Sequence, residues 1–264
     1  MKEHAITYDV EVIDEKMRKK HLSIPAERPL TLYVNKKELL TIMTLGANTR
    51  SLIIGYLRNQ RLVKSLDEIE SIQIDWEVNA AVVKTKNTNS NIDTLTGKVT
   101  LTSGCGQGTM FGDVTAELEK FQLGVDLKLK QSDLLEIIDE VRMYSSIYKQ
   151  AGSVHGCALF KQSKMLFYCE DVGRHNAVDA IAGKMWEFGL EGKDLLFYTT
   201  GRLTSEMVIK GAQMHIPFLL SRSGVTQMGV EMARNVNMTL LGRCSGKHFY
   251  VFNGVERLIF DLLD

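Results

Sequence analysis

The order of hydrophobic and polar residues along the chain changes character near residue 122. Before that point, short runs of alternating character are separated by polar turns, a pattern that predicts β-strands. One helix is predicted over 48–57, with Asn48 as its N-cap. The predicted strands cover residues 30–34, 72–76, 80–84 and 99–102. We therefore expect residues 1–122 to form a small α+β domain.

From residue 132 onward, helical periods alternate with continuous apolar runs. Leu134, Ile138 and Val141 recur at helical spacing and predict an amphipathic helix. The runs GCALF and KMLFYC, joined by a polar turn at 161–163, predict a hairpin. Further helices are predicted over 176–188, 205–214 and 226–236, and further strands over 195–199, 217–220, 238–241 and 249–252. Because strands that are apolar throughout are covered on both faces, residues 123–264 are expected to form an α/β layer sandwich.

Glycine and arginine recur where the strands of this second part end. EDVGRHN follows the hairpin, and the next three strands are followed by TGRLT, SRSG and GRCSGK. Ligands of parallel α/β sheets bind beyond the carboxyl ends of the strands, where helix N-termini and arginine side chains attract phosphate oxygens. The pattern predicts a site for a ligand with several phosphates, formed by Arg174, Arg202, Arg222 and Arg243.

Each of these residues also has a purely structural interpretation. An arginine after a strand can be a solvated surface charge or an ion-pair partner, and His175 can be a structural hydrogen-bonding group. Asn176 followed by Asp179 fits an ordinary helix N-terminus. The hypothesis of a phosphate site therefore depends on the repetition of the pattern, because no single member requires it.

One cysteine stands out by its neighbours. Cys105 lies in the run Ser-Gly-Cys-Gly-Gln-Gly at 103–108. Glycines add no side-chain packing, but they let a partner approach the sulfur and leave backbone amides open to an anion. An accessible thiol near such amides exists partly as thiolate. The pattern predicts a reactive cysteine, and the alternative is a tight turn that contains a cysteine by chance.

Composition narrows the classes of protein that fit. The length of 264 residues fits two domains. Lys plus Arg and Asp plus Glu both number 32, so the protein has no net charge that would attract nucleic acid or anionic lipid. We expect no membrane span and no signal peptide, because no apolar stretch is long enough. Four cysteines are too few for a disulfide framework, so we expect a cytoplasmic protein. Cys157 and Cys169 lie in apolar strands, whereas Cys244 lies in an arginine–glycine loop and is expected to be exposed.

A zinc-dependent nucleobase deaminase is one alternative class for a sandwich of this kind. It would require a His-x-Glu sequence and a Pro-Cys-x-x-Cys sequence. The three prolines, at 25, 29 and 217, are not next to a cysteine, and no two cysteines are three residues apart. We therefore expect no metal site.

Several segments together resemble the FdhD family of formate dehydrogenase accessory sulfurtransferases. They are PLTLYVN at 29–35, SGCG at 103–106, EDVGRHNAVDA at 170–180, TTGRLTSEMVIKGAQMHIPFLLSRS at 199–223 and TLLGR at 239–243. The resemblance extends over most of the chain. It implies a cytidine-deaminase-like three-layer sandwich for the carboxyl-terminal domain, a smaller α+β domain before it, and a homodimer.

The same resemblance implies a function as a sulfur carrier. A cysteine desulfurase would load Cys105 with sulfur as a persulfide, which is a reversible modification of cysteine. The sulfur would pass to the molybdenum of bis(molybdopterin guanine dinucleotide) before this cofactor enters the catalytic subunit of formate dehydrogenase. The molybdenum cofactor would be a transient client, and no cofactor is expected to stay bound. The residues implied to bind it are Arg243, Cys244, Ser245, Gly246, Lys247 and His248, with Arg174, His175, Arg202 and Arg222 from the strand ends.

The chain departs from the family pattern at two places. The family has a second cysteine three residues after the first, where this chain has Gly108, so no neighbouring thiol can relay the persulfide. Near the C-terminal end the family has an aromatic residue and then an arginine two positions later, where this chain has Arg243-Cys244-Ser245. The alternative function is therefore a binding chaperone for the molybdenum cofactor without persulfide chemistry.

Overall fold

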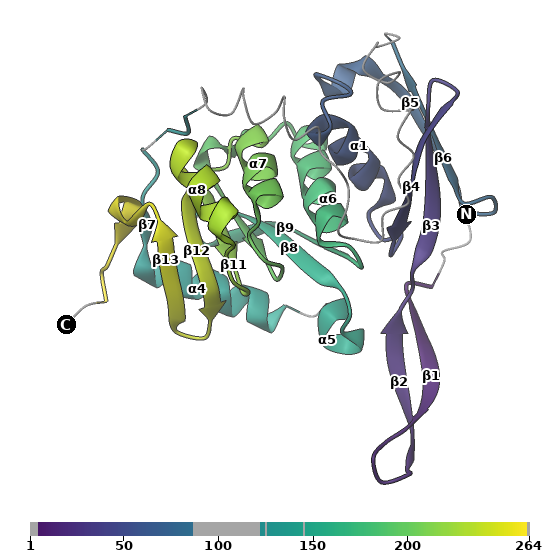
Figure 1. Cartoon of the computed structure of the whole chain (residues 1–264), viewed down its shortest axis with the longest axis horizontal. Coiled ribbons are helices and arrows are strands. Elements are labelled where there is room, and N and C mark those ends of the chain that lie inside the picture. Colours follow the sequence, from purple (N-terminus) through teal and green to yellow (C-terminus); the bar gives the residue numbers. More distant parts are fainter. Residues whose placement is uncertain (1–4, 87–121, 125, 145, 263–264) are drawn as a thin grey trace. The chain divides into compact units, whose positions relative to one another are not determined.

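The chain forms two compact units, and neither is one continuous stretch of sequence. The computed structural model describes residues 5–86, 122–124, 126–144 and 146–262 (Figure 1). Among the described residues, the first unit comprises 5–86, 146–155 and 170–183, and the second comprises 122–124, 126–144, 156–169 and 184–262. The domain boundary expected between residues 122 and 123 stays a prediction. Segments 146–155 and 170–183 belong, by their contacts, with the amino-terminal unit.

A four-stranded sheet is the centre of the first unit. Its strands are β3 (Arg28–Val34), β4 (Lys37–Thr44), β5 (Ile69–Asp75) and β6 (Ala80–Thr85), in the order β4-β3-β6-β5. Strand β3 runs parallel to β6 and antiparallel to β4. Leu30, Leu32 and Val34 alternate along β3 and are fully buried, as a strand with one covered face requires. The strands predicted at 30–34, 72–76 and 80–84 are confirmed, and the one at 99–102 lies outside the described residues.

Two helices of the first unit cross at very short range. Helix α1 (Thr49–Asn59) confirms the helix predicted at 48–57, and it meets residues 174–183 of helix α6 (Arg174–Glu187). Polar groups also join the pair: the Asn59 amide donates a hydrogen bond of 2.6 Å to Asp179. Both residues are buried: Asn59 is 1% and Asp179 is 0% accessible. The crossing fixes the start of α6 and therefore the segment that precedes it.

A separate hairpin and a short helix complete the first unit. Strands β1 (Thr7–Ile13) and β2 (Lys19–Pro25) pair only with each other, in antiparallel register, among the strands that the structure describes (Figure 1). Helix α5 (Ile147–Ala151) packs along β2. The β1–β2 hairpin was not singled out by the hydrophobic pattern of the sequence.

The second unit is built on a six-stranded sheet. The strands are β8 (His155–Lys161), β9 (Lys164–Asp171), β10 (Leu195–Thr199), β11 (Phe218–Ser221), β12 (Thr239–Ser245) and β13 (His248–Asn253), in the order β13-β12-β11-β10-β8-β9. Strands β10, β11 and β12 run parallel, whereas β8 is antiparallel to β10 and β13 is antiparallel to β12. The hairpin and the four later strands predicted from the sequence are confirmed, with β12 longer than expected.

Helices cover both faces of the three parallel strands (Figure 1). Helix α4 (Gln131–Met143) buries its apolar stripe against Leu220 and other residues of one face. Leu219, which precedes Leu220 in β11, points to the other face, next to Gly211 of helix α7 (Ser205–Gln213). Helix α8 (Gln227–Asn235) lies beside α7. The predicted mixed α/β architecture is confirmed, and the cytidine-deaminase-like layering stays a prediction.

Strand pairing and side-chain hydrogen bonds hold the carboxyl-terminal residues against the rest of the second unit. Strand β14 (Leu258–Ile259) runs parallel to β7 (Leu129–Lys130), just before α4. Arg257, fully buried, donates hydrogen bonds to Thr239 Oγ1 and to the carbonyl oxygen of Gly124. In the part of the chain that the structure describes, no helix is long and apolar enough to cross a membrane.

Candidate functional site

The carboxyl ends of β10, β11 and β12 bring three of the predicted arginines to one edge of the sheet. The Arg222 N–H donates a hydrogen bond of 3.0 Å to the carbonyl oxygen of Thr199 at the end of β10. The Arg243 N–H donates one of 2.7 Å to the carbonyl oxygen of Ser223, in the segment after β11. Arg202 follows β10 in the adjoining segment, and all three arginine side chains are exposed. The strand order therefore brings the backbone of these three residues to one edge, and their binding of a phosphate ligand stays a prediction.

Two buried hydroxyl groups organise the loops that carry these arginines. Thr199 Oγ1 accepts a hydrogen bond of 3.0 Å from the Gly201 N–H. Ser221 Oγ donates to the carbonyl oxygen of Gly201 at 2.6 Å and accepts from the Ser223 N–H at 2.9 Å. The N–H groups of Gly201 and Ser223 are consequently used within the fold. An anion at this edge would be bound by the arginine side chains rather than by those two amides.

The loops after β10 and β11 are also joined to each other. Leu203 and Val225 form a parallel bridge, in which the Leu203 N–H donates to the carbonyl oxygen of Gly224. Helices α7 and α8 begin immediately after this bridge, with N-caps at Thr204 and Thr226. Two helix N-termini therefore lie at the edge that carries the arginines, and their partial positive charge has the same sign as the guanidinium groups. The edge is suited to a ligand with several negative charges.

The segment 243–248 has a different structure from the loop that we expected. Strand β12 continues to Ser245, and a two-residue turn leads directly into β13, with Ser245 paired to His248. The expectation that the strand ends at 241 is wrong. The pairing is irregular between Gly242 and Ser245, where Arg243 has a φ of 55°. This bulge turns the Arg243 side chain to solvent and keeps the chain in the sheet. Ser245, Gly246, Lys247 and His248 form the exposed end of the hairpin.

The expectation that Cys244 is exposed is also wrong. Its side chain is 1% accessible and belongs to the core that includes Leu241 and the stripe of α4. In a regular strand, residues 241 and 244 would point to opposite faces, so the bulge at Arg243 is the reason they share one. Burial raises the pKa of the Cys244 thiol to about 12. Cys244 is therefore protonated at neutral pH and is a poor nucleophile.

The motif EDVGRHN holds the first unit together. Strand β9 ends at Asp171, and the carboxylate of Glu170 accepts hydrogen bonds of 2.8 and 2.9 Å from the Ile147 and Tyr148 N–H groups at the start of α5. Asp171 accepts hydrogen bonds from Thr44 Oγ1 at 2.5 Å and from the Leu45 N–H at 3.2 Å. The two acidic residues thus connect the end of β9 to α5 and to the end of β4.

Two further donors complete the environment of Asp171. The Gly173 N–H lies 3.1 Å and the Asn176 amide nitrogen 2.8 Å from its other carboxylate oxygen. The same Asn176 nitrogen donates to the carbonyl oxygen of Met43 at 2.8 Å. Burial raises the pKa of Asp171, and the four hydrogen bonds oppose that shift. Asn176 therefore connects segments that are far apart in the sequence, in addition to its position in the first turn of α6.

Arg174 and His175 belong to this first unit. Arg174 is half-buried and His175 is 2% accessible. Their predicted contribution to a shared phosphate site with Arg202 and Arg222 stays a prediction. The partners of Asp171 at Thr44 and Leu45 were missed by sequence reasoning, because the residues are separated by more than 120 positions and no local pattern connects them.

Besides Cys244, two of the other three cysteines are described by the structure, and both are buried. Cys105 lies outside the described residues, and its predicted reactivity stays a prediction. Cys157 and Cys169 are fully buried in β8 and β9, as expected. Among the residues that the structure describes, no group of three or more His, Cys, Asp and Glu side chains could hold a metal ion.

Comparisons with known proteins agree over nearly the whole chain. The model of the FdhD/NarQ family matches residues 25–259. A protein of Listeria innocua named sulfur carrier protein FdhD is 30% identical over 238 residues, which cover 89% of this chain and 91% of that protein. A protein of the same name from Bacillus subtilis is 28% identical and covers 88% of each chain. The crystal structure of a putative formate dehydrogenase accessory protein from Desulfotalea psychrophila has a TM-score of 0.76 and 26% identity, and the match covers 96% of this chain and 99% of that one.

Proposed function

The chain belongs to the FdhD/NarQ family, and on this premise we propose that it is the sulfur carrier for the maturation of formate dehydrogenase. The observation that carries the proposal is the family match over residues 25–259, which includes Cys105 and the arginine-bearing strand ends. Relatives that cover nearly the whole chain bear the name sulfur carrier protein. Cys105 is the sulfur-bearing residue, and the molybdenum cofactor and the catalytic subunit of formate dehydrogenase are the clients.

The first step is a thiol exchange on Cys105. Its thiolate attacks the terminal sulfur of a persulfide on a cysteine desulfurase, the sulfur–sulfur bond of the donor breaks, and the donor cysteine leaves as a thiolate. Cys105 then holds the terminal sulfur as its own persulfide, with no net oxidation or reduction. In the delivery step the bond between the two sulfur atoms of the Cys105 persulfide would break, Cys105 would return to a thiolate, and the outer sulfur would pass to the client cofactor. Its conversion to sulfide would take two electrons, supplied by the cofactor's molybdenum in a reduced state or by a thiol reductant.

The sheet edge that carries Arg202, Arg222 and Arg243, called the arginine edge from here on, supports binding of the client cofactor. Bis(molybdopterin guanine dinucleotide) carries several phosphate groups, and arginine binds phosphate oxygens through paired N–H donors. Arg202, Arg222 and Arg243 are exposed at that edge, and Lys247 and His248 lie at the tip of the adjoining hairpin. We assign these side chains to the phosphates of the cofactor. The proposal includes a homodimer that acts in the cytoplasm.

A second candidate function is a chaperone that binds the molybdenum cofactor without sulfur chemistry. Two observations favour it: Gly108 stands where the family has a second cysteine, and Cys244 is buried and cannot replace that thiol. The sulfur carrier remains the better proposal because the exchange described above needs only one thiol on the acceptor.

The test is to incubate the protein with a cysteine desulfurase and L-cysteine and to measure its intact mass. One added sulfur atom is expected, and peptide mapping should place it on Cys105. Cys105→Ser should abolish both the added mass and the maturation of formate dehydrogenase, whereas Cys244→Ala should retain both. Full maturation by Cys105→Ser would replace the sulfur carrier with the chaperone.

A further inference from the structure

The β1–β2 hairpin has one mainly apolar and one mainly polar face. Cross-strand partners share a face, and faces alternate along each strand. The pairs Tyr8–Ile24, Val10–Leu22 and Val12–Lys20 therefore lie on one side. The pairs Asp9–Ser23, Glu11–His21 and Ile13–Lys19 lie on the other. We call Tyr8, Val10, Val12, Leu22 and Ile24 the apolar stripe.

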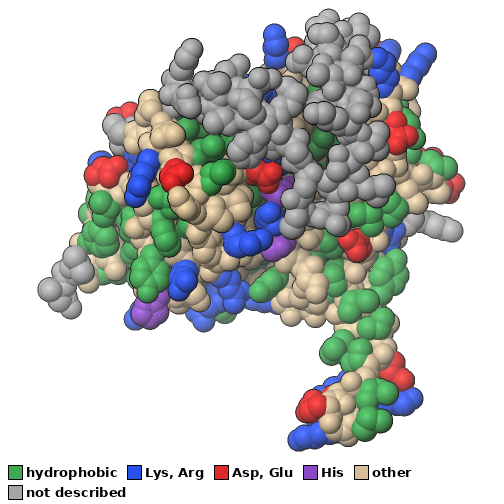
Figure 2. Space-filling model, viewed as in Figure 1, with side chains coloured by type: hydrophobic (Ala, Val, Ile, Leu, Met, Phe, Trp, Pro, Cys, Tyr) green, Lys and Arg blue, Asp and Glu red, His purple; other side chains and the backbone are tan. Residues whose placement is uncertain are grey.

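Three of the five side chains of the apolar stripe are exposed, and Val10 and Val12 are half-buried. Tyr8 is 49%, Leu22 52% and Ile24 42% accessible, although α5 packs along β2. Figure 2 shows hydrophobic side chains along the hairpin. A two-stranded hairpin is marginally stable in water by itself, and contiguous exposed apolar side chains mark interaction sites. The hairpin thus lacks the burial that would account for its apolar face.

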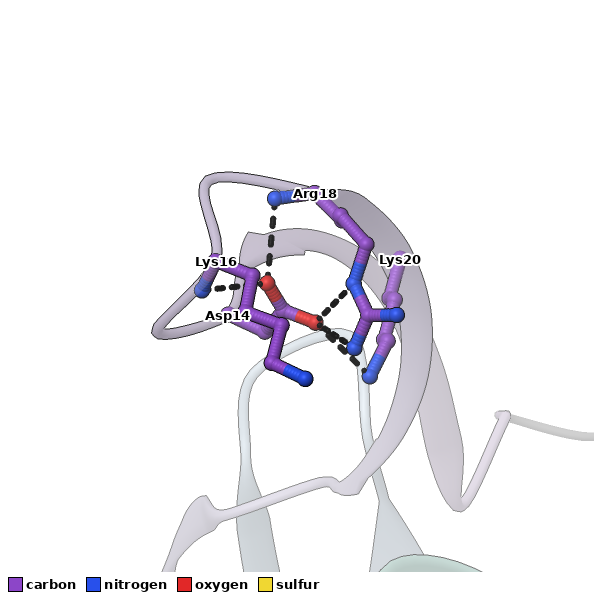
Figure 3. A network of polar contacts seen from close by, with 4 residues as sticks. All are labelled: Asp14, Lys16, Arg18 and Lys20. Atoms are coloured by element: carbon purple, nitrogen blue, oxygen red, sulfur yellow. Dashed lines mark hydrogen bonds and ion pairs between the residues drawn. The ribbon is translucent and has the colours of Figure 1, made fainter.

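Cations lie at both ends of the apolar stripe. At the tip, Asp14 accepts from Arg18 and Lys20, and its ion pairs with them measure 2.7 and 3.0 Å (Figure 3). The Arg18 and Lys20 side chains remain 57% and 49% accessible, so two cationic side chains stay exposed at the tip although the hairpin carries no net charge. At the base, Arg28 donates a hydrogen bond of 2.8 Å to the Tyr8 hydroxyl. A complementary surface would be apolar with carboxylates at its margins.

We propose that the apolar stripe docks the catalytic subunit of formate dehydrogenase, through an apolar strip of that subunit flanked by acidic residues. The inference rests on the proposed function for the identity of the partner. The exposed stripe supplies the apolar contact, and Arg18, Lys20 and Arg28 supply the charge selection. Such an arm would hold the client while sulfur and cofactor are handed over.

Two other occupants fit the charges less well. A second copy of the hairpin, packed antiparallel on the stripe, would bring the cationic tip of one copy to Arg28 of the other, and like charges repel. An anionic membrane would meet four acidic residues together with four basic ones, because Asp9, Glu11, Asp14 and Glu15 balance Lys16, Arg18, Lys19 and Lys20. That balance gives no electrostatic attraction to a lipid surface.

The test compares two double variants of the hairpin. Leu22→Thr with Ile24→Thr makes the stripe polar and places β-branched residues at both positions. Glu11→Thr with His21→Thr, the control, changes a cross-strand pair of exposed residues on the opposite face. Affinity for the purified catalytic subunit, prepared without its cofactor, is measured by biolayer interferometry. The stripe variant should bind about tenfold more weakly or worse, as the loss of a central apolar contact predicts, and the control within about twofold. Equal affinities would overturn the proposal.

A second measurement shows whether weaker binding of the stripe variant comes from an unfolded hairpin instead of a lost contact. A photo-crosslinking amino acid is placed at Leu22 or, separately, at His21 in the otherwise unchanged chain. Crosslinks to the catalytic subunit are expected from position 22 and not from position 21. Crosslinks from both positions or from neither would contradict docking on the stripe. Light scattering and co-sedimentation with phosphatidylglycerol vesicles test the other occupants, and a stripe-dependent dimer or vesicle binding would also overturn it.

The outcome separates this inference from the proposed function. If the stripe variants bind and mature the enzyme normally while Cys105 still acquires sulfur, the docking inference fails and the sulfur carrier stands. If Cys105 acquires no sulfur but the stripe still binds the catalytic subunit, the sulfur carrier fails and the docking inference stands.

Discussion

Gly55 and Gly183 face each other's helices at the crossing of α1 and α6. A Cβ atom on Gly55 would overlap the carbonyl oxygen of Asp179, and a Cβ atom on Gly183 would overlap the carbonyl oxygen of Ser51. The atoms in the way are backbone atoms of a helix, which cannot move aside as a flexible side chain can. The two glycines therefore set how closely the helices approach, and α6 begins directly after the loop that Asp171 organises.

We predict that Gly55→Ala and Gly183→Ala each destabilise the protein. Forcing a methyl group into the crossing must separate the helices, at a cost of about 1–3 kcal/mol. Chemical denaturation followed by circular dichroism measures the change. Gly224→Ala is the matched control, because a Cβ there meets no atom within 4 Å and its φ is not in the left-handed region. A control as destabilised as the two crossing variants would refute the steric explanation.

The hydrogen bonds of Asp171 lead to a second prediction. All four of its neighbours are donors, so an amide at this position would set its own NH₂ group against two of them. Asp171→Asn should cost about 1–3 kcal/mol of stability and loosen the connection between β4 and β9. Asp126→Asn, at an exposed position, is the control. If Asp171→Asn left stability unchanged but abolished maturation, Asp171 would have a chemical role instead of a positioning one.

The third prediction concerns phosphate binding at the arginine edge. Removing one charge-assisted hydrogen bond to phosphate costs about 1.5–3 kcal/mol. Arg202→Ala, Arg222→Ala and Arg243→Ala should therefore each weaken binding of GDP by about tenfold or more, and the remaining affinity should fall as salt rises. Isothermal titration calorimetry measures both effects. Arg234→Ala, in the last turn of α8, removes an exposed arginine of the same unit and should leave binding unchanged. Salt-independent binding would exclude the edge as a phosphate site.

Burial of Cys244 predicts a loss of stability in alkali. Its pKa is about 12 in the folded protein and 9.0 in an unperturbed thiol. Below pH 9 both states keep the proton, and above it the unfolded chain ionises while the folded protein does not. Stability should therefore fall as pH rises from 9 toward 12, by at most about 1.4 kcal/mol per pH unit from this residue.

The variant Cys244→Ala isolates that contribution. The difference in unfolding free energy between it and the wild type should change with pH above 9 and stay constant between pH 6 and 8. Iodoacetamide should leave Cys244 of the native protein unmodified at pH 8 and should label it after denaturation. Rapid native labelling would mean that the thiol is accessible after all.

Local periodicity was sufficient to predict most of the elements of the second unit. The apolar stripe of α4 and the uniformly apolar β10 and β11 each carry their own signal, since helix and strand periods are read over a few neighbouring residues. The arrival of Arg202 and Arg222 at one sheet edge follows from the same signals, because parallel neighbouring strands end on the same side.

Only the tertiary structure decided the features that depend on distant pairing. The bulge at Arg243 exists because β12 pairs with β13, and it places Cys244 in the core. Two contacts join segments more than 120 residues apart. One is the hydrogen bond between Asp171 and Thr44, and the other is the helix crossing at Gly55 and Gly183. A backbone contact of this kind depends on which surfaces meet, and that choice is made by the packing of the whole chain rather than by the period of any one segment.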